Sequence, residues 1–281
     1  MKYKIFDELD RLKKRFIFAL VFISFLCYGQ TSIETNNFPK PKNGKTYVIA
    51  HRGAHKDSPE NTLSAYKKAI ELGCDFIEID VRKTKDGKFV SMHNSRIDEY
   101  IDGKSGRVNE FTLCELKNMK IFKDKNITDN FDRIPTLEEI LDLCKGKIGI
   151  YLDLKEPYVD EISAIIKKYK MEREVVWYIP FSYLDEIKKL NEVCEECIPM
   201  PDPEEKVKLN FLLNEIKPQV IATDMSQLDS EFISVSHQYN SKVFVDENSG
   251  NEEEWKNIID INCDGIQTDD PEKLINFLKK K

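Results

Sequence analysis

The chain has 281 residues, of which 41% are hydrophobic, and its formal net charge is −7. This length is in the range of one large domain, and the hydrophobic share is enough for a sizeable core. Lysine and glutamate are mixed along the chain, so the surface is expected to be mildly acidic. That charge argues against nucleic acid as a partner, because binding to a phosphate backbone requires a basic patch.

The N-terminus resembles a secretory signal peptide. Basic residues at 11–15 precede an apolar run at 16–28, and Cys27 and Gly29 place small residues at positions −3 and −1 of a cleavage site. This pattern predicts a signal peptide over residues 1–29 and an exported protein, either periplasmic or secreted. A membrane anchor or a buried helix is the alternative, although the run is short for a helix that spans a bilayer.

Residues 30–45 are polar and predict a linker, and from residue 46 onward short apolar runs alternate with amphipathic stretches. The expected strands are 47–50, 76–81, 147–153, 175–179, 197–200, 219–223, 242–245 and 265–268. The expected helices are 62–72, 160–169, 182–191, 204–216, 230–239, 251–261 and 271–280. Pro199 weakens the prediction of its strand. Eight strands with interleaved helices predict an α/β fold of the (β/α)₈ TIM-barrel type over residues 46–281.

An additional apolar run at 89–93 follows the second expected strand too closely for a helix between them. Asp86-Gly87 is a two-residue turn signal, so the two runs are predicted to form a β-hairpin. In the register that such a turn gives, Asp80 lies opposite His93. Directly opposed residues are about 5 Å apart at Cβ, so the hairpin would bring His93 to Asp80. A slip by one residue would turn His93 to the other face.

The connection after His93 is unusually long. Residues 95–146 separate it from the third expected barrel strand, with helices expected at 112–119 and 136–144. Connections between barrel elements are usually short. We therefore expect this segment to form a small inserted lobe near the barrel mouth.

Three carboxylates are candidates for a metal site. Glu78 and Asp80 are two residues apart on an expected strand, so their side chains point to the same face. Asp153 also ends an expected strand. Any one of them could be a solvated strand end. Together they predict a site for a hard divalent cation such as Ca²⁺ or Mg²⁺, which prefers oxygen ligands.

Two histidines and two basic residues accompany these carboxylates. His51 closes the first expected strand and His93 closes the hairpin, so they could serve as general acid and general base. Metal binding by the histidines, which would favour zinc, is the alternative. Arg52 and Lys155 are expected to bind an anion such as phosphate. Glu60 could hold a metal, orient His51, or be an ordinary carboxylate in the first turn of a helix.

Further residues carry structural expectations. Asn61 is expected to cap the helix at 62–72. Gly53 is expected to let the backbone approach a ligand closely. Cys194 and Cys197 have the spacing of a redox motif, but the two glutamates between them disfavour a reactive thiolate. A structural pair or two plain thiols is therefore the better interpretation.

Nine short segments, in the same order, resemble the glycerophosphodiester phosphodiesterase family within the phospholipase-C-like phosphodiesterases. They are residues 51–53, 59–62, 69–75, 77–81, 84–87, 92–93, 134–140, 153–155 and 265–269. The resemblance covers nearly all of residues 46–281. It implies a (β/α)₈ barrel with an inserted lobe that hydrolyses glycerophosphodiesters to glycerol 3-phosphate and an alcohol, using a divalent cation.

The resemblance also implies a role for each candidate residue. These roles are acid/base catalysis by His51 and His93, metal binding by Glu78, Asp80 and Asp153 with Glu60 as a further ligand, and phosphate binding by Arg52 and Lys155.

The sequence departs from the family's pattern at three places. Asn94 stands where the family usually has Asp, so it can accept a hydrogen bond from the preceding imidazole but adds no charge. Asp153 stands where the family usually has Glu and is one methylene shorter. Asp246 and Glu247 replace neutral residues at the expected barrel mouth. We expect these two to contact the substrate and to favour a cationic head group such as ethanolamine or choline.

The leading prediction is an exported, metal-dependent phosphodiesterase that acts on a small glycerophosphodiester. One alternative is an enzyme of the phospholipase D or sphingomyelinase type that cleaves intact lipid at a membrane surface. An apolar exposed face on the 95–146 lobe would favour it. The other alternative is a catalytically weak homologue that only binds, for which Asn94 is the main support. The sequence leaves the oligomeric state open.

Overall fold

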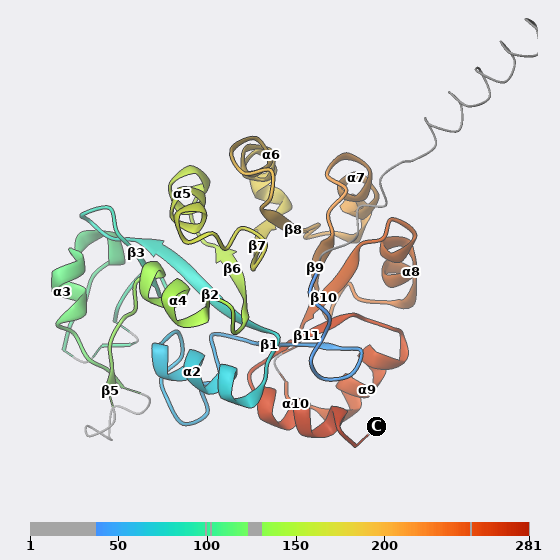
Figure 1. The fold of residues 1–281 in the computed structure, drawn as a ribbon, viewed down its shortest axis with the longest axis horizontal. Coiled ribbons are helices and arrows are strands. Elements are labelled where there is room, and N and C mark those ends of the chain that lie inside the picture. The colour runs from blue at the N-terminus through green and yellow to red at the C-terminus, as the bar shows by residue number, and fades with distance from the viewer. Residues whose placement is uncertain (1–37, 99, 102, 123–130, 248, 281) are drawn as a thin grey trace, which may run out of the picture. The chain divides into compact units, whose positions relative to one another are not determined.

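The computed structural model describes residues 38–98, 100–101, 103–122, 131–247 and 249–280 (Figure 1). The predicted signal peptide at 1–29 and the first half of the predicted linker at 30–45 lie outside these residues. Residues 40–281 form one compact unit. None of the helices in the described part of the chain is long and apolar enough to cross a membrane.

A barrel of eight parallel strands forms the centre of this unit, as predicted. The strands are β1 (Tyr47–Ala50), β2 (Phe76–Lys83), β6 (Gly149–Leu154), β7 (Val175–Pro180), β8 (Ile198–Asp202), β9 (Val220–Asp224), β10 (Lys242–Asp246) and β11 (Gly265–Thr268). Hydrogen-bonded neighbours follow the order β8-β7-β6-β2-β1-β11-β10-β9. Every expected strand is present, with bounds that agree to within two residues. The fold-class prediction is confirmed.

The barrel closes between β8 and β9 by side-by-side packing. Among the described strands, β8 forms a ladder with β7 alone. Pro199 and Pro201 lie in β8, and residues two apart in a strand direct their backbone nitrogens to the same edge. Because proline has no N–H, the two residues remove two donors from one edge of β8. The strand that Pro199 made doubtful therefore exists, with hydrogen bonds on one side.

Helices surround the strands (Figure 1). They are α2 (Leu63–Leu72), α4 (Leu137–Cys144), α5 (Val159–Tyr169), α6 (Leu184–Val193), α7 (Leu209–Glu215), α8 (Ser230–Gln238), α9 (Glu252–Asp260) and α10 (Pro271–Leu278). The short helices η2 (Phe181–Tyr183) and η3 (Lys206–Lys208) precede α6 and α7. The main hydrophobic core lies between these helices and the outward-facing residues of the strands.

The predicted hairpin is present, but its register differs from the prediction by one residue. β3 (Phe89–Ser91) pairs antiparallel with β2. The N–H of Thr84 donates to the carbonyl of Lys88 at 2.8 Å, which leaves three residues in the turn rather than two. The residue opposite Asp80 is consequently Met92, whose N–H donates to the Asp80 carbonyl at 3.0 Å. The expected pairing of Asp80 with His93 is wrong.

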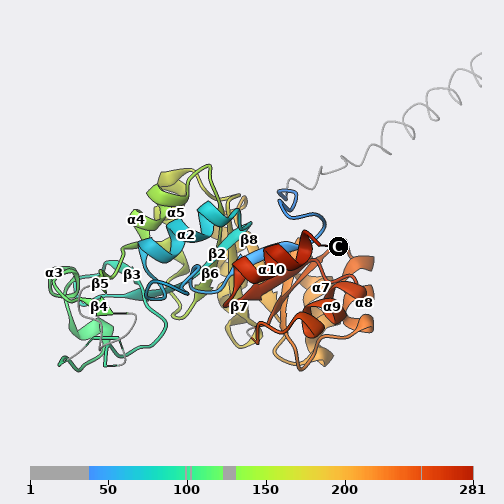
Figure 2. The same ribbon diagram turned by 90° about the horizontal axis from the view of Figure 1, so that it is seen from below.

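An inserted lobe follows the hairpin, and it lies beyond β2 and β3 in both views (Figures 1 and 2). Its elements are η1 (Val108–Glu110), α3 (Leu113–Lys117), β4 (Ile121–Phe122) and β5 (Phe131–Asp132). It has a hydrophobic cluster of its own, which includes Val90, Met92, Ile97, Leu116 and Ile134. The expected helix at 136–144 is present as α4. It belongs to the barrel rather than to the lobe, because it packs between α2 and α5. The predicted insertion of 95–146 is therefore too long at its C-terminal end.

The floor of the barrel is aromatic. The rings of Tyr47, Phe76 and Phe244 face inward, with centroids 5.3–6.1 Å apart. Two glycines provide the space for them. A Cβ at Gly149 would lie 2.4 Å from the ring of Phe76, and one at Gly265 would lie 2.4 Å from the ring of Phe244. The rings fill the interior at the N-terminal ends of the strands, so the cavity opens at the C-terminal ends.

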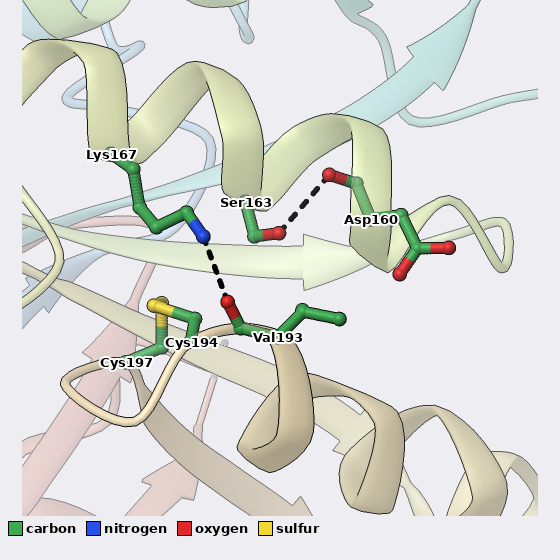
Figure 3. Close-up of a disulfide and its surroundings, with 6 residues drawn as sticks. All are labelled: Asp160, Ser163, Lys167, Val193, Cys194 and Cys197. Carbon is green, nitrogen blue, oxygen red and sulfur yellow. Dashed lines mark hydrogen bonds between the residues drawn. A yellow bond between two sulfur atoms is a disulfide. The ribbon is translucent and has the colours of Figure 1, made fainter.

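A disulfide joins Cys194, which ends α6, to Cys197, which precedes β8 (Figure 3). Both cysteines are buried. Next to them, Nζ of Lys167 on α5 donates to the carbonyl of Val193 at 2.8 Å. The disulfide closes the α6–β8 connection, as expected for a structural pair.

We expect Gly149→Ala to lower the free energy of unfolding by about 1–3 kcal/mol, the usual cost of overpacking a core. The added Cβ would overlap the ring of Phe76. Urea unfolding measures the change. Phe76→Leu provides the control: because it removes the ring, the double variant should lose less stability than the sum of the two single losses. Additive losses would contradict this explanation.

Candidate active site

Three carboxylates meet at the C-terminal ends of β2 and β6. The strands pair in parallel with Asp80 beside Asp153, and Glu78 lies two residues before Asp80 on the same face. One oxygen of each carboxylate lies within 4.8 Å of the other two. Oxygens that share one Ca²⁺ can be up to about 5 Å apart. The structure therefore brings together three of the predicted metal ligands in a group that one cation could bridge.

The carboxylates carry more negative charge than their surroundings neutralise. Burial, reinforced by the charges of Asp80 and Asp153, raises the pKa of Glu78 well above its ordinary value. Burial also raises the pKa of Asp153 to about 6. Burial acts to raise the pKa of Asp80 too, but the charges of Lys155 and His93 and hydrogen bonds from Asn61 and Lys155 together outweigh it, so the pKa of Asp80 is lowered. Nζ of Lys155 is 3.0 Å from Asp80 Oδ1 and 2.5 Å from Asp153 Oδ2.

Arg52 follows β1 and joins two carboxylates from different segments. Its backbone N–H donates to Glu78 Oε2 at 2.7 Å, and its Nη1 donates to Glu60 Oε1 at 2.9 Å. Tyr100 of the lobe donates to the same Glu60 oxygen at 3.0 Å. Glu60 thus lies outside the group of three carboxylates and holds the guanidinium of Arg52. Metal binding by Glu60 stays a prediction without support from this geometry.

The turn after β1 is fixed by packing. Arg52 and Gly53 have φ angles of 52° and 84°, and a Cβ at Gly53 would lie 2.8 Å from Ala65 of α2. The expected reason for this glycine was the approach of a ligand. In the structure, contact with α2 already requires it.

Asn61 supports the carboxylates from behind. Thr62, not Asn61, caps α2. Asn61 is buried, and its Nδ2 donates to Asp80 Oδ2 at 2.7 Å, while its Oδ1 accepts from Tyr66 at 2.9 Å and from Ser91 at 2.8 Å. With three partners its side chain is fixed, and it orients Asp80. The cap expected from the sequence concealed this role, although Asn61 belongs to one of the segments that resemble the family.

His51 is oriented by a residue that sequence reasoning did not select. Its Nδ1 is 2.7 Å from Oδ1 of Asp269, and Nε2 of His55 is 3.1 Å from the same oxygen. Because β1 pairs with β11, the ends of these strands lie side by side. Burial acts to raise the pKa of Asp269, but hydrogen bonds from the two histidines lower it overall. Asp269 is thus shared by two histidines, His51 and His55.

His93 reaches the cavity by a different route from the predicted one. The chain leaves β3 after Ser91, and Nε of Arg82 donates to the backbone carbonyl of His93 at 2.9 Å. The expected hydrogen bond to Asn94 is present, with 2.7 Å between His93 Nδ1 and Asn94 Oδ1. Burial lowers the pKa of His93, although the charge of Asp80 opposes this. His93 is thus held at both its backbone and its ring.

Asp246 and Glu247 face opposite sides of the barrel wall. Asp246 lines the cavity. Glu247 is 1% exposed and accepts a hydrogen bond from the indole N–H of Trp255 on α9. The predicted contact of Glu247 with substrate is therefore wrong. Consecutive residues of an extended chain point to opposite faces, so only one of the pair can face the cavity.

One cavity of about 610 Å³ lies at the C-terminal ends of the strands. That volume is in the usual range of small-molecule sites. Eight of the ten predicted site residues line it; the other two are Glu60 and Glu247. The eight are His51, Arg52, Glu78, Asp80, His93, Asp153, Lys155 and Asp246.

Comparison with known proteins assigns the chain to a family. The sequence profile of the glycerophosphoryl diester phosphodiesterase family matches residues 51–273. The chain belongs to this family. A glycerophosphodiester phosphodiesterase from Caldanaerobacter subterraneus subsp. tengcongensis is 32% identical over 257 residues, which are 84% of this chain and 99% of that protein. The resemblance seen in the sequence is confirmed.

Solved structures share the fold. A glycerophosphodiester phosphodiesterase from Agrobacterium tumefaciens aligns with a TM-score of 0.73 at 23% identity, over 82% of this chain and 99% of that one. An Oleispira antarctica phosphodiesterase in complex with the product sn-glycerol-3-phosphate aligns with a TM-score of 0.72 at 22% identity, over 83% and 96%. Both agree with the barrel described above.

In this family member, we expect Asp269→Asn to lower kcat for diester hydrolysis by about ten- to a hundredfold, as for other partners that orient functional histidines. An amide can donate to Nδ1 of His51 and stabilise the wrong tautomer. KM should change little. The matched control is Asp185→Asn, which removes an exposed carboxylate on α6. Wild-type kcat in Asp269→Asn would contradict the role of Asp269.

We expect Asn94→Asp to shift one limb of the pH profile of kcat/KM upward by about one pH unit. A carboxylate at Nδ1 of His93 would stabilise the imidazolium, so the pKa of His93 should rise. The control is Asn109→Asp, which adds the same charge on η1 of the lobe and should leave the profile unchanged. An unshifted profile in Asn94→Asp would show that His93 does not titrate in the rate-limiting steps.

Proposed function

We propose that the chain is a metal-dependent hydrolase that converts glycerophosphodiesters to glycerol 3-phosphate and an alcohol, with two histidines as the acid/base pair. Its family makes it a glycerophosphodiester phosphodiesterase. The observation that carries the finer proposal is the convergence of three carboxylates, two cations and two histidines in one cavity.

Glu78, Asp80 and Asp153 would hold the metal. Their oxygens suit Ca²⁺ or Mg²⁺. Burial is the main cause of the raised pKa values of Glu78 and Asp153, and a cation bound beside them would favour their ionised forms. A divalent cation there polarises phosphoryl oxygens and offsets the charge that develops during displacement.

The remaining residues bind the phosphate and move protons. Arg52 and Lys155 line the cavity beside the carboxylates and would bind phosphate oxygens. Nδ1 of His51 contacts the carboxylate of Asp269, and Nδ1 of His93 contacts the amide of Asn94. Nε2 of each ring is therefore left for proton transfer. One histidine accepts the proton of the attacking oxygen, which belongs to water or to the adjacent glycerol hydroxyl. Attack by the hydroxyl would give a cyclic phosphate first, and water would then open it to glycerol 3-phosphate. The other protonates the leaving alcohol.

A deacylated diester fits the lobe better than an intact lipid does. Phe131 is the only large hydrophobic side chain that is exposed among the described residues of the lobe. Lys120 and Arg133 lie over its ring. The lobe therefore presents no broad apolar face in the part described.

Hydrolysis of an intact lysolipid is the second candidate. Tyr183, Val207, Phe211 and Met225 are exposed, and they follow β7, β8 and β9 at the mouth. Exposed apolar groups at a mouth are a feature of enzymes that contact membranes.

The pattern at residues 1–29 adds the proposal that the protein is exported.

The purified protein should release glycerol 3-phosphate from glycerophosphoethanolamine, lose this activity on chelation, and regain it with Ca²⁺ or Mg²⁺. His51→Ala and His93→Ala should each lower kcat by at least about a hundredfold, the usual contribution of a general acid or base. His237→Ala is the matched control, because His237 lies on α8 outside the cavity.

Each part of the proposal has its own contrary result. Full activity after chelation would contradict the metal, and near wild-type activity in either histidine variant would contradict the acid/base pair. Faster cleavage of a lysolipid than of the matching deacylated diester would favour the second candidate. No release from any diester would favour a homologue that only binds.

A further inference from the structure

The cavity has two sides of different chemistry. The phosphate side, formed by β1, β2 and β6, holds the metal candidates together with Arg52 and Lys155. The acidic side is formed by the ends of β8, β9, β10 and β11, and we define it as Asp202, Asp224, Asp246 and Gln267. No lysine or arginine of the described lining residues lies on the acidic side.

Two acceptors on the acidic side have no donor among the residues that the structure describes. Gln267 lines the cavity and is 4% exposed, and its buried Oε1 has no hydrogen-bond partner. Oδ1 of Asp246 is likewise buried and unpaired. The two residues are direct neighbours in the β10–β11 ladder. A buried acceptor without a donor is costly, so two neighbouring ones indicate a group that donates hydrogen bonds from the ligand.

The other two carboxylates are held in place by the protein. Asp202 accepts from the hydroxyl of Tyr178 at 2.8 Å and from the N–H of Glu204 at 2.7 Å. Asp224 accepts from the N–H of Ser226 at 2.7 Å. These bonds fix the carboxylates without a countercharge. The two carboxylates therefore add negative potential on the side of the cavity that holds the unpaired acceptors of Asp246 and Gln267.

We propose that the acidic side is a subsite for a primary ammonium group carried by the leaving alcohol of the diester, a proposal that rests on the function proposed above. An ammonium group supplies the N–H donors that the two unpaired acceptors lack and the positive charge that the side lacks. A quaternary ammonium has no N–H and would leave both acceptors unpaired. A neutral hydroxyl would donate without offsetting the charge.

The location of the subsite agrees with the order of groups in such a diester. β6 pairs with β7, and Asp153 of the phosphate side lies beside Tyr178, whose hydroxyl contacts Asp202. On the other flank, β11 pairs with β1, whose end carries His51. The acidic side therefore adjoins the phosphate side on both flanks. A short amino alcohol bound through its phosphate could reach it.

The test compares kcat/KM for three diesters that share the glycerol phosphate part: glycerophosphoethanolamine, glycerophosphocholine and glycerophosphoglycerol. We expect wild type to prefer the ethanolamine diester to both others. In Asp246→Asn, the ratio of kcat/KM for the ethanolamine diester to that for the glycerol diester should fall about tenfold, because a hydrogen bond to a charged partner is lost. Gln267→Met should lower this ratio too. Asp185→Asn, an exposed acid on α6, should leave it unchanged.

A second readout does not depend on activity. Gln267→Met removes an unpaired buried acceptor, so its melting temperature should equal or exceed that of wild type. Phosphoethanolamine, titrated calorimetrically, should bind Asp246→Asn about tenfold more weakly than wild type. An unchanged ratio together with unchanged binding, or preference for the choline diester, would overturn the subsite. Failure to cleave any diester would instead overturn the proposed function, and the titration would still decide the subsite.

Discussion

The site depends on keeping three carboxylates within a few ångströms of one another in a largely buried space. Their mutual repulsion and their desolvation both oppose folding, so the barrel must hold them by other means. The β2–β6 ladder fixes Asp80 beside Asp153, and the backbone N–H of Arg52 and the amide of Asn61 bond to the group. Lys155 neutralises only part of the charge, and the remainder would attract the cation that we propose for the site.

Much of the fold and of the site was predictable because it depends on local patterns. A strand places alternate residues on one face, which is enough to assign Glu78 and Asp80 to the same face. Parallel strands of a barrel end at one rim, which brings Asp153 to them. The inward sequence of Phe76, Glu78 and Asp80 shows the change from floor to site along a single strand.

One error is local: the hairpin register depends on a turn of three residues, and the Asp86-Gly87 signal fits turns of either length. The other errors lie where a contact between distant segments decides. Asp269 acquires its role only because β11 lies beside β1. The side of the barrel wall to which Glu247 points depends on which residues of β10 face inward and on the contact with Trp255 of α9. None of these contacts leaves a periodic signal in the sequence.

The two prolines of β8 have a mechanical consequence. Ladders of backbone hydrogen bonds tie the strands of the phosphate side to one another, whereas among the described strands no ladder joins β8 to β9. The segments after these two strands are linked by side chains instead: Lys206 contacts Asp229, and Gln227 donates to the Glu204 carbonyl. Asp202 ends β8 on one side of the seam between the two strands, and Asp224 ends β9 on the other. A change in width at this seam would break those side-chain contacts but no backbone ladder. The half of the mouth that holds the proposed metal ligands is tied by ladders throughout, and the seam lies in the half that we propose to meet the variable part of the substrate.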